Sequence, residues 1–122
     1  MKSRKVWIGR WLMAVAALHT VVGLVMGEPV LVDIAQRGVF NTVTDDRPLV
    51  GMVTWFLLCG GLLALLGMAI DSLERSAQFP GARALGIGMT LMTFVGVILM
   101  PVSGFWLVFP PAIALMRIKT TK

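Results

Sequence analysis

The chain carries little charge. Only 14% of its 122 residues are Asp, Glu, Lys or Arg, whereas a soluble domain has about 25%. Apolar residues make up 57% of the sequence, and they form four long runs. The scarcity of charge excludes an ordinary soluble domain. It predicts one domain, residues 1–122, whose solvent is the lipid bilayer.

Cysteine and histidine are equally scarce, with Cys59 and His19 the single residue of each type. One cysteine cannot form an intrachain disulfide, and no CxxC motif or Cys/His cluster indicates a metal site. The net charge of +5 comes from basic residues at the ends of apolar runs rather than on one polar face, which argues against nucleic-acid binding. No small-residue cleavage site follows the first run, so we expect an uncleaved signal-anchor rather than a removed signal peptide.

The four apolar runs predict an all-α integral membrane four-helix bundle with spans at residues 7–26, 48–70, 83–100 and 105–118. Crossing the hydrocarbon core takes about 20 helical residues, so the last two spans are short. A tilted fit, a thinned bilayer or a turn near residues 101–104 would accommodate them. A re-entrant fourth segment is the alternative.

The segment between the first two spans predicts a short interfacial helix over residues 29–38. Pro29 can open it, Gly38 can close it, and its apolar side chains share one face. Asp33 and Arg37 stand four residues apart and can pair on its polar face. This helix lies on lipid headgroups or, alternatively, covers the outer mouth of the bundle as a lid.

Lys and Arg are divided unequally between the two sides of these spans. The loop before the second span holds two of the eleven, Arg37 and Arg47. Because positive charge stays in the cytoplasm, we expect both termini to lie on the inner side of the membrane. The other nine would lie on the cytoplasmic side: Lys2, Arg4, Lys5, Arg10, Arg75, Arg83, Arg117, Lys119 and Lys122.

Small residues recur at helical spacing within the spans, as expected where helices approach closely in lipid. This pattern predicts a tight bundle, and it leaves the oligomeric state open. The predicted contact glycines are Gly23 and Gly27 in the first span, Gly60, Gly61 and Gly67 in the second, and Gly86 in the third.

His19 is the one ionisable side chain deep within an apolar run, and such groups are either bonded inside the bundle or used in function. Pro110 and Pro111 lack N–H groups, so the carbonyls of Trp106 and Leu107 lose their helical donors. A neutral His19 could donate to one of them, as a structural hydrogen bond between spans. The alternatives are a pocket in which His19 contacts a ligand or moves a proton, and axial ligation of haem completed by a second chain.

Several residues lie at a depth similar to that of His19 and define a candidate intramembrane pocket for a small lipophilic ligand. No second titratable group lies at this depth, so the pattern favours binding over catalysis and leaves enzymatic activity open. An accessory or scaffold subunit of a membrane complex and an oligomeric small-solute transporter are the competing functions. The candidate ligand-binding residues are His19, Thr20, Gly23, Trp55, Cys59, Thr93, Trp106 and Pro110.

Several segments together resemble a family of small four-span bacterial membrane proteins of unknown function. The resemblance covers nearly the whole chain and is most specific between Met100 and Pro111. It implies four spans rather than a re-entrant segment, and it implies no activity, cofactor or catalytic residue. The segments that carry it are Gly9-Arg10-Trp11-Leu12, Leu18-His19-Thr20, Gly23-Leu24, Trp55-Phe56-Leu57 with Gly60, Met100-Pro101-Val102-Ser103-Gly104-Phe105-Trp106-Leu107 and Pro110-Pro111.

Overall fold

The structure is a computed structural model that describes residues 5–119, and all regular secondary structure in this range is helical. Pro48 opens the third helix and Pro29 lies in the first turn of the second, positions where a missing N–H costs nothing. The predicted all-α class is confirmed. The elements are α1 Ile8–Met26, α2 Glu28–Gln36, α3 Pro48–Arg75, α4 Ala82–Leu99, the 3₁₀ helix η1 Gly104–Val108 and α5 Phe109–Met116.

Three of these helices, α1, α3 and α4, are long and apolar enough to cross a membrane. The fourth apolar segment, Gly104–Met116, is shorter and consists of η1 followed directly by α5. The second predicted span ended at residue 70, whereas α3 continues to Arg75. This extension places Asp71 and Glu74 on the helix itself.

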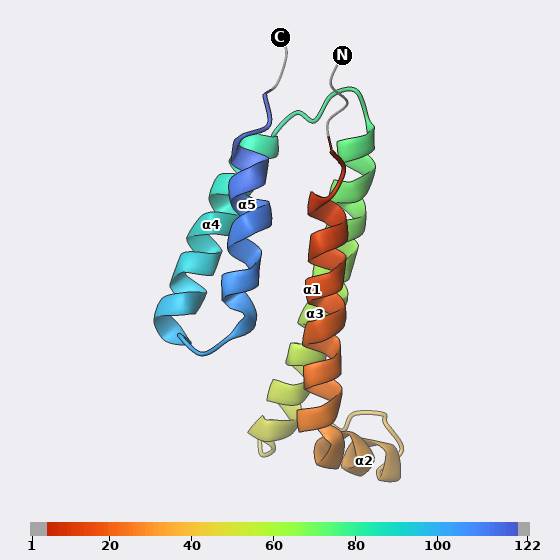
Figure 1. The fold of residues 1–122 in the computed structure, drawn as a ribbon. Coiled ribbons are helices and arrows are strands. Elements are labelled where there is room, and N and C mark those ends of the chain that lie inside the picture. Colours follow the sequence, from red (N-terminus) through yellow and green to blue (C-terminus); the bar gives the residue numbers. More distant parts are fainter. Residues whose placement is uncertain (1–4, 120–122) are drawn as a thin grey trace.

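The helices associate as two pairs (Figure 1). The first pair is α1 with α3, and the second pair is α4 with α5; the two pairs meet where α1 contacts η1 and α5. Within the described residues, α3 and α4 do not approach each other closely. Both described chain ends and the α3–α4 connection lie at one end of the molecule, the terminal end, and α2 lies across the opposite end.

The buried core gathers at the terminal end, where α1 begins, α3 ends and α4 begins. Elsewhere, large apolar side chains such as Leu62, Leu91 and Phe94 are exposed, as expected for helices whose solvent is lipid. The core therefore fixes the relative positions of the two pairs near the chain ends. Its members include Ile8, Leu12, Ile70, Phe79, Ala82, Met89, Ala112 and Leu115.

At the opposite end, Asp33 of α2 holds two arginines. The Arg37 guanidinium donates to Asp33 at 2.9 Å, which confirms the predicted pair. Arg47 also donates to Asp33, and to the Thr42 carbonyl oxygen at 3.1 Å. These contacts fasten the loop that connects α2 to α3.

Candidate functional site

His19 lies half-buried on α1, where it contacts Phe56 of α3. Its Nε2 lies 2.8 Å from the Phe56 carbonyl oxygen, and because a carbonyl only accepts, Nε2 is the donor. The imidazole also stacks on the Phe56 ring, with ring centroids 3.9 Å apart and planes 12° apart. His19 therefore joins the two helices of the first pair.

Glycines on both helices let α1 and α3 approach closely beside His19. A Cβ on Gly60 would lie 2.7 Å from Thr20 Oγ1 and 3.0 Å from His19 Cδ2. A Cβ on Gly23 would lie 2.7 Å from a methyl group of Leu57. His19, Thr20 and Gly23 thus form a tight helix contact with α3.

The other candidate residues lie apart from this contact. Trp55 and Cys59 are exposed on α3. Thr93 is buried on α4, where its hydroxyl donates to the Met89 carbonyl oxygen at 2.6 Å. The exposed Trp106 donates from Nε1 to the Pro101 carbonyl oxygen at 2.8 Å.

The remaining candidate, Pro110, lines a cavity at the terminal end. The structure therefore brings three of the eight candidates together and leaves five elsewhere.

The Leu107 carbonyl freed by Pro111 takes a donor from the first span, but this donor is Trp11 and not the predicted His19. Trp11 Nε1 lies 2.7 Å from the Leu107 carbonyl oxygen, and this bond joins α1 to η1. The Trp106 carbonyl accepts from the Phe109 N–H within its own segment. The expectation that His19 serves a freed carbonyl was wrong, because its Nε2 reaches Phe56 instead.

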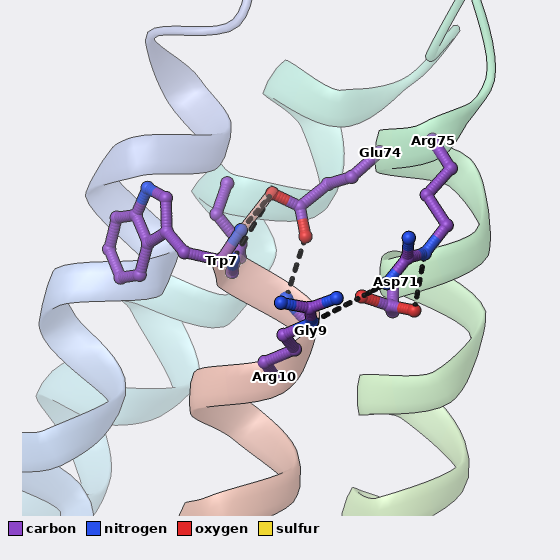
Figure 2. Close-up of polar contacts among 7 residues, drawn as sticks. Trp7, Gly9, Arg10, Asp71, Glu74 and Arg75 are labelled. Carbon is purple, nitrogen blue, oxygen red and sulfur yellow. Dashed lines mark hydrogen bonds and ion pairs between the residues drawn. The ribbon is translucent and has the colours of Figure 1, made fainter. Parts of the chain in front are cut away.

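A carboxylate that the sequence reasoning missed lies at the start of α1 (Figure 2). Glu74, only 3% exposed, extends from α3 to this point. Its Oε1 accepts from the backbone N–H groups of Trp7 at 3.3 Å and Ile8 at 3.1 Å, and its Oε2 accepts from Gly9 at 2.8 Å. The first N–H groups of a helix have no partners within it, so Glu74 caps α1 from another helix.

Asp71 lies one turn before Glu74 and forms a more exposed ion-pair network. Arg75 donates to both of its oxygens, at 2.9 and 3.3 Å, and Arg10 Nε lies 3.7 Å from Asp71 Oδ1. Gly9 permits this approach, because a Cβ there would lie 2.3 Å from the Asp71 backbone nitrogen. One sequence signal was available: two acids three residues apart at the end of the longest apolar run.

An open cavity of about 540 Å³ lies at the terminal end, between the start of α1 and the end of α5. Six of its lining residues are apolar and four are charged. Within residues 5–119, no group of three or more His, Cys, Asp or Glu side chains could hold a metal ion. The lining residues are Trp7, Ile8, Pro110, Ile113, Ala114 and Ile118, with Lys5, Glu74, Arg117 and Lys119.

A family model described as a family of unknown function (DUF6463) matches residues 3–122. The chain belongs to this family. The resemblance to a family of unknown function over nearly the whole sequence is thereby confirmed. No curated protein and no solved structure matches the chain. In this DUF6463 member, polar side chains that join helices include those of Trp11, His19, Asp71 and Glu74, and cations near the chain ends line the cavity.

Proposed function

We propose that the protein is a four-span protein of the bacterial inner membrane with both termini in the cytoplasm. Support comes from the terminal end, where Lys5, Arg10, Arg75, Arg83, Arg117 and Lys119 lie on or beside helix ends. Of the Lys and Arg residues in the described range 5–119, two lie at the opposite end, and both are bound to Asp33. The lipid surface that retains positive charge is the cytoplasmic one.

The fourth span in this proposal is η1 with α5. At the usual rise per residue, its five 3₁₀ and eight α-helical residues extend about 22 Å, less than the hydrocarbon thickness of about 30 Å. A locally thinned bilayer accommodates the difference at a modest free-energy cost. The bilayer is then thinnest beside the second pair.

Within this membrane protein, we propose that the cavity at the terminal end binds a small amphiphilic molecule that enters from the bilayer. The observation that carries this proposal is the cavity's composition: an apolar wall from α1 and α5 beside a charged rim. Ligand sites are concave and mostly apolar, with a few polar groups that fix orientation. At the membrane interface, this combination suits a molecule with one hydrocarbon chain and one polar head.

The sequence predicted a small lipophilic ligand at His19, whereas the ligand proposed here is an amphiphile and its site lies at the terminal end. His19 donates a hydrogen bond to the Phe56 carbonyl oxygen and stacks on the Phe56 ring. These contacts suit a residue that joins two helices better than one that lines a pocket. We propose binding rather than turnover, because the buried Glu74 accepts three backbone N–H groups as a helix cap. Ligand contact by His19, haem ligation, an accessory or scaffold role and oligomeric transport stay predictions.

The test is titration of the protein in mild detergent with lysophosphatidylcholine, a single-chain amphiphile, followed by native mass spectrometry. We expect saturable binding of one molecule. Ala114→Trp and Ile113→Trp, which fill the cavity, should each weaken it at least tenfold. Leu91→Trp, on an exposed position of α4, is the matched control and should bind normally. Equal binding by all variants would overturn the cavity as the site.

A further inference from the structure

The rim of the cavity carries an excess of positive charge. Lys5, Arg117 and Lys119 line it together with one acid, Glu74. In the part of the chain that the structure describes, none of the three cations lies within 4.0 Å of a carboxylate oxygen. Arginines at the opposite end, by contrast, are bound to Asp33.

Glu74 offsets only part of this charge, because it is one carboxylate beside three cations and it also accepts hydrogen bonds from the start of α1. Both of its oxygens point to the first backbone N–H groups of that helix (Figure 2), at 2.8 to 3.3 Å. The positive end of the helix dipole offsets a carboxylate placed there. The cations are therefore the groups that a ligand head at the mouth would meet.

Resting on the proposed function, we infer that the ligand head is an anionic phosphate ester. An arginine and two lysines that converge on one mouth match phosphate oxygens, the arginine through paired donors and the lysines as point charges. Basic pockets between membrane helices on the cytoplasmic side bind anionic lipid headgroups in the same way. The hydrocarbon chain of the ligand lies against Ile113 and Ala114 of the apolar wall.

The test compares lysophosphatidylglycerol, whose head is anionic, with lysophosphatidylcholine of the same chain length, whose head is zwitterionic. At low salt we expect the anionic probe to bind at least tenfold more tightly. That preference should shrink at 0.5 M salt, where the screening length is only a few ångströms. Binding is measured by native mass spectrometry and by intrinsic fluorescence, to which Trp7 in the cavity wall contributes.

Charge variants test which cations produce the preference for the anionic probe. The triple variant Lys5→Gln, Arg117→Gln, Lys119→Gln should bind both probes equally, and Arg117→Gln alone should lose part of the preference. Arg83→Gln removes a cation at the same end that does not line the cavity, so it should leave the preference unchanged. A preference that survives the triple variant, or that disappears equally in Arg83→Gln, would overturn the inference.

The outcomes separate this inference from the proposed function. Equal binding of both lysolipids to the unmodified protein would overturn the inferred preference for an anionic head and leave amphiphile binding intact. Binding of neither would overturn the proposed function itself. Glycerol 3-phosphate distinguishes the source of the phosphate: weak binding assigns the site to lipid. If glycerol 3-phosphate binds as tightly as lysophosphatidylglycerol, the site recognises phosphate, but the proposal that its ligand is an amphiphile is overturned.

Discussion

The two helix pairs differ in the polar bonds that join them. In the first pair, polar side chains bond across the interface: Glu74 reaches the start of α1, and His19 reaches the Phe56 carbonyl. In the second pair, the hydroxyls of Thr90 and Thr93 return to carbonyl oxygens of α4 itself, at 2.8 and 2.6 Å. These two hydroxyls add no bond between α4 and α5.

Close contact at glycines joins α4 to α5 and to η1, as it also joins the helices of the first pair. A Cβ on Gly86 would lie 2.7 Å from the Ala112 carbonyl oxygen, and a Cβ on Gly96 would lie 2.7 Å from the Phe105 ring. Lipid provides no hydrophobic drive for helices to associate, so packing and hydrogen bonds must do so. The comparison shows both means used within one small chain.

The largest effect should follow from removing the carboxylate of the first pair. Glu74→Ala leaves three N–H groups at the start of α1 without their acceptor, two of them on the buried residues Ile8 and Gly9. We expect a loss of about 3 kcal/mol in the free energy of unfolding, from the lost cap and the unmade hydrogen bonds. Unfolding in detergent, followed by circular dichroism against temperature and denaturant, measures it.

Two variants sharpen this prediction. Glu74→Gln keeps one acceptor oxygen, so it should lose less than Glu74→Ala. Asp71→Asn weakens only the more exposed ion pairs with Arg10 and Arg75, so it should change stability little. A Glu74→Ala protein as stable as Asp71→Asn would contradict the assigned cap.

A smaller effect should follow from adding one methyl group to the second pair. Gly86→Ala places a Cβ against the Ala112 carbonyl and Met116, and forcing the helices apart should cost about 1 to 2 kcal/mol. Gly88→Ala, two residues further on the same helix, is the matched control because its Cβ would meet no atom within 4 Å. The control should be neutral or slightly stabilising. Equal effects of the two substitutions would show that close packing at Gly86 does not stabilise the second pair.

The sequence predicted the long helices, the short α2 and most of the contact glycines, because apolar runs, prolines and small-residue spacing are local signals. Gly61 was predicted as a contact glycine together with Gly60, yet a Cβ added to Gly61 would meet no atom within 4 Å. Successive helical residues differ by about 100° in direction, so composition alone did not fix the contact face. The partner helix fixes it.

The Glu74 cap and the cavity could not be predicted in the same way. The cap's partners are backbone N–H groups, which every residue except proline carries, so no side-chain pattern marks them. The cavity is lined by residues from both ends of the chain, from Lys5 to Lys119. Their meeting depends on how the two pairs dock. The hydrogen bond from Trp11 to Leu107 was likewise predictable only in part. The two prolines predicted a freed carbonyl, but its donor depends on how the two pairs dock.

Among the three interhelical contacts compared here, His19 should contribute the least to stability. His19→Ala removes one hydrogen bond and one ring stack at a half-buried position, and such interhelical bonds contribute about 0.6 to 2 kcal/mol. We therefore expect a loss of about 1 kcal/mol, with Cys59→Ala, exposed on α3, as the neutral control. Lysophosphatidylcholine binding should be unchanged, because His19 does not line the cavity. If His19→Ala lost lysophosphatidylcholine binding but kept its stability, His19 would be part of the ligand site rather than a contact between helices. A loss of about 3 kcal/mol, matching that of Glu74→Ala, would instead show that the middle of the first pair depends on polar bonds as much as its terminal end does.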